Sequence, residues 1–104
     1  MSEETRTLGR FADPAILVLA SLAERPRHGY AITRDVLLLT GIHLGPGTLY
    51  GTIARLENRN WIRRLPASGR RHPYEITQEG RDFLRTECRG LKEFAESALA
   101  RAAL

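Results

Sequence analysis

The sequence contains little of what disulfide-bonded, secreted or membrane-spanning proteins require. Its single cysteine, Cys88, excludes an internal disulfide framework and suits a reducing cytoplasm. Its longest apolar runs, Ala15–Ala20 and Val36–Leu39, are far too short to cross a bilayer. No positively charged start is followed by an apolar stretch and a small-residue cleavage site, so we expect no signal peptide. The composition therefore predicts a cytoplasmic protein without a membrane partner.

The sequence also contains few combinations of residues that could form a catalytic or metal-binding site. The three histidines, His28, His43 and His72, are dispersed along the chain, and neither a histidine pair at helical spacing nor a cysteine pair accompanies them. No glycine-rich phosphate loop follows a parallel-strand pattern. Several carboxylates instead fall on an expected solvated helix face, namely Glu79, Asp82 and Glu93. We therefore predict no enzyme activity, no metal site and no cofactor.

The positive charge of the chain is concentrated in one segment. Residues 55–72 contain six arginines and one acidic residue, Glu57, which gives this segment a charge of +5, whereas the whole chain of 104 residues has a net charge of +4. Such a block can be a solvated face, a membrane contact or the binding surface for a polyanion. The block is not one amphipathic helix, which argues against a membrane. A polyanionic partner is the favoured interpretation.

The length allows one small domain, which hydrophobic periodicity predicts to begin with three short helices. Asp13 can cap the first helix, which starts with a proline that suits the first helical position and runs to about Ala23. The second helix is expected over residues 28–40, with Gly41 as its stop. The side chains expected on its buried side are Ile32, Val36 and Leu39.

The third helix lies within the segment GPGTLYGTIARLE, residues 45–57, and is expected to end near residues 58–60. Its buried face is predicted by the 4-then-3 spacing of Leu49, Ile53 and Leu56. The opposite face has few side chains and holds Gly47, Gly51, Ala54 and Asn58, with Arg55 beside them. A glycine inside a helix lowers its stability by about 1 kcal/mol relative to alanine, so the presence of Gly51 calls for an explanation. Either it contacts a neighbouring element, or the helix backbone approaches a ligand such as DNA closely.

A hairpin and a last helix complete the pattern. Period-two alternation predicts strands over Trp61–Leu65 and Pro73–Thr77, joined by an arginine-rich turn, and Pro73 restricts its strand to an edge. Trp61 is expected to pack under the third helix. Thr77 can cap the last helix. That helix carries a heptad seam, which predicts self-association, at Leu84, Cys88, Leu91, Ala95, Ala98 and Ala102. The residues expected to form the self-association contact are Leu84, Cys88, Leu91, Phe94, Ala95 and Ala98.

Three motifs carry a resemblance to a known family. "HGYAI" at residues 28–32, "GPGTLYGTIARLE" at residues 45–57 and "YEITQEG" at residues 74–80 occur in the order and spacing of the PadR family of transcriptional regulators. The resemblance covers roughly residues 13–90, and the single helix after the hairpin is similar to the short branch of that family. The chain departs from the usual pattern at four positions, Gly45, Gly51, Asn60 and Glu75.

The resemblance implies a mainly α fold with a two-stranded β-hairpin, a winged helix-turn-helix with a C-terminal dimerisation helix. The expected parts are a flexible arm over residues 1–11, the DNA-binding domain over 12–78 and the dimerisation helix over 79–104. The third helix would enter the groove, and the hairpin, or wing, would hold phosphates. Together, the resemblance and the third helix's face predict DNA contacts from His28, Tyr30, Pro46, Gly47, Thr48, Tyr50, Gly51, Arg55, Asn58, Arg70, Arg71 and His72.

The predicted function is that of a sequence-specific DNA-binding transcriptional regulator. The resemblance implies a homodimeric repressor on a palindromic operator in double-stranded DNA, released by a small-molecule effector that the sequence does not identify. The alternative is a winged-helix module that docks an acidic protein partner through its basic hairpin. The third helix discriminates between them, because protein docking generally uses bulky anchors where this helix has glycines.

Overall fold

The computed structural model describes residues 13–67 and 69–104. Within these residues the chain forms three helices, a two-stranded antiparallel hairpin and a long last helix. The elements are α2 (Pro14–Glu24), α3 (Gly29–Thr40), α4 (Pro46–Asn58), β1 (Ile62–Arg64), β2 (Tyr74–Ile76) and α5 (Gln78–Ala102). The predicted fold class, mainly helical with a winged hairpin and a long C-terminal helix, is confirmed. The predicted N-terminal arm lies outside the described residues.

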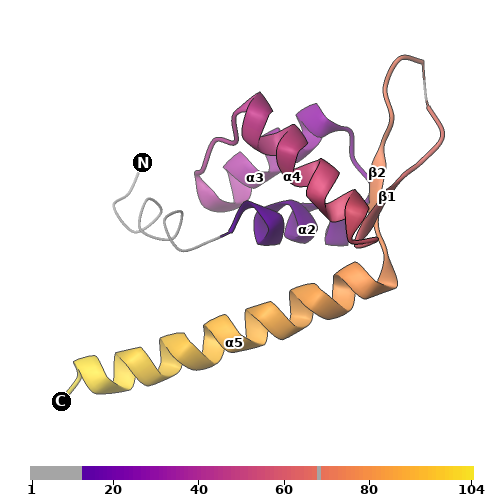
Figure 1. The fold of residues 1–104 in the computed structure, drawn as a ribbon. Coiled ribbons are helices and arrows are strands. Elements are labelled where there is room, and N and C mark those ends of the chain that lie inside the picture. Colours follow the sequence, from indigo (N-terminus) through magenta and orange to yellow (C-terminus); the bar gives the residue numbers. More distant parts are fainter. Residues whose placement is uncertain (1–12, 68) are drawn as a thin grey trace.

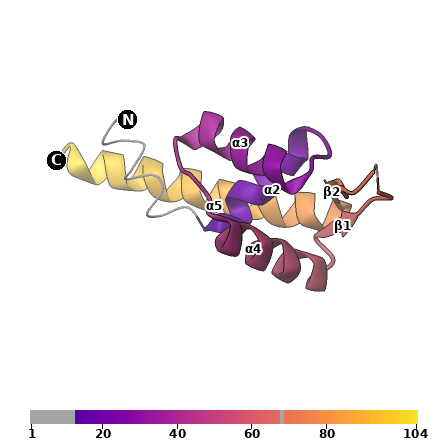
Figure 2. The ribbon, with the colours of Figure 1, turned by 90° about the horizontal axis from the view of Figure 1, so that it is seen from above.

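Helix α2 is the centre of the core. It contacts α3, α4, β2 and α5, and it lies between the α3–α4 pair and α5 (Figure 1). Seen from above, α3 and α4 flank α2 on opposite sides while α5 runs beneath it (Figure 2). The apolar run of α2 fits this position, because its buried residues include Ala15, Leu17, Val18, Leu19 and Leu22. Helices α3 and α4 are thereby held at fixed positions on one central support.

The helix ends follow the capping chemistry that the sequence predicts. Asp13 Oδ1 accepts a hydrogen bond from the Ala15 N–H at 2.8 Å. Gly41 ends α3 in the left-handed region at φ 77°, where glycine has no steric penalty. Thr77 Oγ1 accepts the Gly80 N–H at 3.0 Å and so caps α5. These local signals set where three of the four helices begin or end.

The predicted buried face of α3 is wrong at one position. Leu39 is 63% exposed, whereas Thr40 is only 8% exposed and takes the buried position after Ile32 and Val36. A threonine can occupy this site because its hydroxyl donates to the Val36 carbonyl at 2.8 Å, so no polar group is left unsatisfied. The buried residues of α3 therefore repeat every four residues at its C-terminal end.

Both strands are shorter than predicted. The ladder pairs Ile62 with Ile76 and Arg64 with Tyr74, so each expected strand loses its two end residues. At the far end of β2 the chain turns into α5, because Thr77 acts as a helix cap instead of continuing the ladder. The hairpin is therefore a minimal ladder of three residue pairs.

The joint between the hairpin and α5 has no linker. The Thr77 hydroxyl donates to the Asn60 carbonyl at 2.8 Å, and the Thr77 N–H donates to the Trp61 carbonyl at 2.9 Å. Gly80 is buried directly against that same Trp61 carbonyl oxygen, and a Cβ at Gly80 would also lie 2.9 Å from Ile76 Cγ1. The first turn of α5 is therefore fixed against the base of the hairpin.

The two faces of α4 can be separated by mutation. Leu56 is 2% exposed in the core, whereas its neighbour Arg55 is exposed. Leu56→Ala should lower the free energy of unfolding by about 2–5 kcal/mol, because it empties a packed site. Arg55→Ala should change it by no more than about 0.5 kcal/mol. Denaturant unfolding of both variants checks this, and an unfolded Arg55→Ala protein would show that the helix faces have been misassigned.

Candidate nucleic-acid interface

A hollow of about 380 Å³ lies between the start of α3, the side of α4 and the hairpin. It brings together six of the residues that the sequence predicts for DNA binding, although they come from three separate segments. The lining residues are His28, Tyr30, Tyr50, Arg64, Arg70, Arg71, His72 and Tyr74. Arginines, histidines and tyrosine hydroxyls can all donate hydrogen bonds, so the hollow is a surface that suits anionic oxygen atoms.

Tyr50 can take its place in the lining of this hollow because residue 29 is a glycine. Its hydroxyl oxygen lies 2.5 Å from the position that a Cβ on Gly29 would take. Gly29 is buried at the first position of α3, and Tyr50 remains 52% exposed. The glycine of the "HGYAI" motif therefore makes room for the tyrosine of "GPGTLYG", and the two motifs meet in one site.

The exposed face of α4 is bare in the structure as well. A Cβ added at Gly47 or Gly51 would meet nothing within 4 Å. The alternative that Gly51 is required by contact with a neighbouring element of the fold therefore finds no support in the described residues. Pro46 and Thr48 on the first turn are exposed too. The N-terminal half of α4 thus offers exposed backbone to a ligand outside the chain.

The hairpin carries its positive charge in two different ways. At its base, Arg63 pairs with Glu75 at 2.9 Å, and Arg64 lies 3.6 Å from Glu57. Nearer the tip, Arg70 and Arg71 are exposed. Glu75 is one of the positions where the sequence departs from the family pattern, and its carboxylate neutralises the charge of Arg63 at the base of the hairpin. The arginines near the tip are therefore the main cationic groups that the hairpin offers to a ligand.

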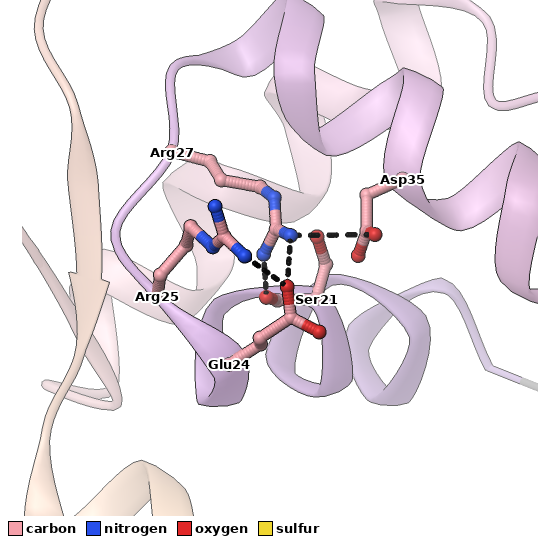
Figure 3. A network of polar contacts seen from close by, with 5 residues as sticks. All are labelled: Ser21, Glu24, Arg25, Arg27 and Asp35. Atoms are coloured by element: carbon pink, nitrogen blue, oxygen red, sulfur yellow. Dashed lines mark hydrogen bonds and ion pairs between the residues drawn. The ribbon is translucent and has the colours of Figure 1, made fainter.

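A largely covered arginine outside the predicted basic block connects this region to the core. The Arg27 side chain is only 11% exposed and lies 2.7 Å from Glu24 and 3.4 Å from Asp35 (Figure 3). It also donates to the Ser21 carbonyl. The hydrogen bond from Arg27 and its charge lower the pKa of the Glu24 carboxyl. Arg27 therefore ties the end of α2 to α3, a role that no sequence spacing revealed.

The backbone of Arg27 also extends the hairpin. Its N–H donates to the Tyr74 carbonyl at 3.1 Å, and its carbonyl accepts the Tyr74 N–H at 2.9 Å. This bridge joins the α2–α3 turn to β2. The Tyr74 ring in turn lies beside the Arg64 guanidinium, 5.8 Å from its carbon to the ring centroid. The hairpin is thereby attached to the helices on the side where the hollow lies.

Two predicted DNA contacts lie elsewhere. Arg55 and Asn58 line a second cavity with Trp61 and Phe83, on the flank of α4 away from Tyr50. The Arg55 guanidinium lies 3.4 Å from the Thr52 hydroxyl, to which it donates. The structure thus places the predicted contacts on both flanks of α4, with the bare strip between them.

Trp61 lies at the end of α4 but packs mainly against the last helix. Its ring is stacked on Phe83 with centroids 3.8 Å apart, at an interplanar angle of 17°. The backbone N–H of Trp61 donates to the Leu56 carbonyl at 3.0 Å. The expectation that Trp61 packs under the third helix is therefore incomplete, because α5 supplies the aromatic partner.

Most of the predicted self-association seam on α5 is exposed in the single chain. Leu84 differs, because it is half-buried and packs against the chain's own core. Further along, Leu91 is 44% and Phe94 is 73% exposed. The remaining seam residues are also exposed, namely Cys88, Ala95 and Ala98. The C-terminal half of α5 therefore presents an apolar stripe with no partner among the described residues.

Across residues 13–67 and 69–104, no group of three or more histidine, cysteine or acidic side chains is arranged to hold a metal ion. In the same part of the chain, no helix combines the length and hydrophobicity needed to cross a membrane.

Comparison with known proteins identifies the family. The chain matches the family described as "Transcriptional regulator PadR-like family" over residues 18–86. Its fold is similar to that of a PadR family transcriptional regulator from Eggerthella lenta DSM 2243, with a TM-score of 0.71 and 30% identity, covering 81% of this chain and 76% of that one. It is also similar to a PadR family transcription regulator from Clostridium difficile R20291, with a TM-score of 0.70 and 29% identity over 83% of this chain and 97% of that one.

One curated relative is considerably longer. An uncharacterized 37.1 kDa protein in transposon TN4556 of Streptomyces fradiae is 43% identical over 82 residues, which are 79% of this chain. The chain spans only 24% of that relative's length. The relative's name states no activity, so the family match and the similar structures carry the assignment. The chain belongs to the PadR-like family of transcriptional regulators.

Proposed function

We propose that this regulator binds double-stranded DNA with α4 in the major groove and the hairpin along the adjacent phosphates. The observation that carries this proposal is the bare face of α4, where Gly47 and Gly51 leave open space for a duplex. The hollow beside it supplies hydrogen-bond donors from Tyr50, Arg70 and Arg71. A helix N-terminus with free N–H groups favours phosphate oxygens, and side chains further along the helix read base edges.

We further propose that the protein acts as a homodimeric repressor on a palindromic operator. The support is the exposed apolar stripe on α5, with Leu91 on the heptad seam and Phe94 beside it, which a second copy would cover. Two-fold symmetry would present two copies of α4 to two half-sites. A small-molecule effector that releases the operator completes this proposal. Selection of binding sites from random duplex DNA at a stated salt concentration would show whether the recovered sites are palindromic.

The salt dependence of binding tests the role of the hairpin tip. Each phosphate neutralised contributes about 0.9 to the slope of log affinity against log salt concentration. Replacing Arg70 and Arg71 together by alanine should reduce the magnitude of this slope by about 2 units and should weaken binding to all DNA sequences by a similar factor. The measurement is operator affinity at four or more salt concentrations for wild type and variant.

A control with the same loss of charge makes this result specific. Arg85 and Arg89 are both exposed on α5, outside the hollow and away from the predicted self-association residues. Alanine at both positions should leave the slope nearly unchanged. A tip variant whose slope equals that of the wild type would show that the hairpin tip does not touch the DNA backbone.

The alternative is a module that docks an acidic protein through the same basic hairpin. It predicts affinity for an acidic polypeptide such as polyglutamate but no sequence preference among DNA duplexes. The bare face of α4 favours DNA, because protein interfaces are anchored by bulky aromatic and arginine side chains. Equal binding to all duplexes, with stronger binding to polyglutamate, would support the alternative.

A further inference from the structure

The bare strip of α4 is a surface without hydrogen-bonding side chains. It consists of Gly47, Gly51 and Ala54, which lie on one face of the helix and are all exposed. A Cβ added at either glycine would meet nothing within 4 Å. The strip therefore presents Cα–H groups and one methyl group to a ligand, over a length of about 10 Å.

The backbone along this strip has few free hydrogen-bonding groups beyond its first turn. The Leu49 N–H donates to the Gly45 carbonyl at 2.9 Å, and from that residue onward the N–H groups are bonded within the helix. Beside the strip, the Thr52 hydroxyl donates to the Thr48 carbonyl at 2.6 Å and accepts from the Arg55 guanidinium at 3.4 Å. These polar groups are therefore used within α4 itself.

The donors available to a ligand lie on the two flanks of α4 instead. Tyr50, Arg70 and Arg71 line the hollow on one flank, and Arg55 and Asn58 line the cavity on the other. Such groups suit phosphate oxygens and other polar groups along the walls of a groove. The middle of the helix, which would face the floor of the groove, is the part that has no polar side chain.

The absence of side chains also changes how deeply the helix can enter a groove. The Cα atoms of an α-helix lie on a cylinder of about 2.3 Å radius, whereas a helix with its side chains has a radius of about 5–6 Å. Along Gly47 and Gly51 the backbone can therefore approach the floor of the major groove about 3 Å more closely than a helix with long side chains. At that distance the strip contacts whatever projects from the base edges.

The base edges in the major groove differ in what they require of such a surface. Guanine, adenine and cytosine present acceptors or amino donors there, whereas thymine also presents a C5 methyl group. A polar edge held against Cα–H groups loses water without gaining a partner, which is unfavourable. A methyl group needs no hydrogen-bond partner and is favoured by leaving water.

We propose that the bare strip of α4 recognises thymine methyl groups on the floor of the major groove, an inference that rests on the proposed DNA-binding function. Ala54 supplies a methyl-to-methyl contact, and Gly47 and Gly51 permit the close approach that this contact needs. The strip covers about three base pairs, because its length of about 10 Å compares with about 3.4 Å per base pair. The DNA class bound is therefore one with thymine under α4.

Deoxyuridine tests this inference, because uracil keeps the hydrogen-bonding groups of thymine and lacks only its methyl group. Each thymine of the selected operator is replaced in turn, and affinity is measured at fixed salt concentration. We expect at least one position at which the replacement weakens binding about fourfold, the effect of one buried methyl group. Replacement outside the segment under α4 should change affinity little.

Cytosine methylation gives the reverse test. At the sensitive position, replacing T·A by C·G should weaken binding, because the methyl group is lost and an amino donor faces the strip. Methylating that cytosine at C5 should recover about fourfold of the loss, since the methyl group returns while the amino group stays. No recovery would overturn a contact made through the methyl group.

Two protein variants locate the contact. Ala54→Gly removes the methyl group from the strip, and Ala100→Gly makes the same change on the exposed surface of α5. In Ala54→Gly the penalty for deoxyuridine at the sensitive position should fall from about fourfold to about twofold or less, whereas Ala100→Gly should keep the wild-type penalty. Comparing the two duplexes within each variant removes any difference in helix stability.

The outcomes separate this inference from the proposed function. Recovery of no preferred duplex from the selection would overturn both together. An operator that is bound specifically and tolerates deoxyuridine at every position would leave the proposed function in place and overturn the thymine contact. An equal deoxyuridine penalty in Ala54→Gly and wild type would overturn it as well.

Discussion

Gly51→Leu should sharply reduce specific DNA binding while making the protein slightly more stable. Leucine is a better helix former than glycine by about 0.5–1 kcal/mol, and the structure leaves open space at the Cβ position. A leucine side chain on the bare face of α4 would hold the helix away from the groove. Losing two base contacts of about 1–3 kcal/mol each is enough to lower operator affinity at least about thirtyfold.

Melting temperature and operator affinity should be measured on one preparation at fixed salt and protein concentration. Gly51→Ala is the graded control, because a methyl group brings a similar gain in helix stability with much less bulk. It should lose far less affinity than Gly51→Leu. If Gly51→Leu binds the operator as wild type does, the α4 backbone does not approach DNA closely at this position.

The second large effect is on the free energy of unfolding, and it compares two glycines of α5, Gly80 and Gly90. Gly80→Ala should destabilise the protein by about 1–3 kcal/mol, because the new Cβ would run into the Trp61 carbonyl oxygen, a backbone atom that cannot swing aside. Gly90→Ala in the same helix should stabilise it by up to about 1 kcal/mol, since its Cβ would meet open space.

Thermal unfolding at one protein concentration measures both changes. For a domain of this size, 1 kcal/mol corresponds to a shift in melting temperature of roughly 4–8 °C. The two alanine variants should therefore differ from wild type in opposite directions. Equal melting temperatures for Gly80→Ala and wild type would show that the joint between hairpin and α5 adjusts easily, so that it does not fix the direction of the last helix.

Local signals in the sequence predicted most of the fold. The caps at Asp13 and Thr77 and the stop at Gly41 depend on residues close in sequence, and all three are present in the structure. Periodicity also gave the buried face of α4 correctly, as Leu49 and Leu56 show. These predictions held because hydrogen bonding near a helix end and burial of one helix face are properties of short segments.

Other features depend on how distant segments meet. Leu39 was wrongly predicted to be buried because three consecutive leucines leave the buried face of α3 ambiguous. Thr40 is buried instead, and its hydroxyl donates to the Val36 carbonyl. The side chain of Arg27 is held by Asp35 across the α2–α3 turn, which no periodicity encodes. The division of the predicted DNA contacts between two flanks of α4 likewise depends on where the hairpin and Trp61 pack.

The bridge between Arg27 and Tyr74 has a consequence for self-association of strands. A short hairpin exposes N–H and carbonyl groups along its edges, and such edges can pair with strands of other molecules and lead to aggregation. Here the backbone of Arg27 forms hydrogen bonds with both the N–H and the carbonyl group of Tyr74 on the outer side of β2. On the other edge, β1 is only three residues long and carries Arg63 and Arg64. One edge is thus capped and the other is short and charged. The hairpin can present its arginine-rich tip to a ligand while leaving little free edge to recruit another strand.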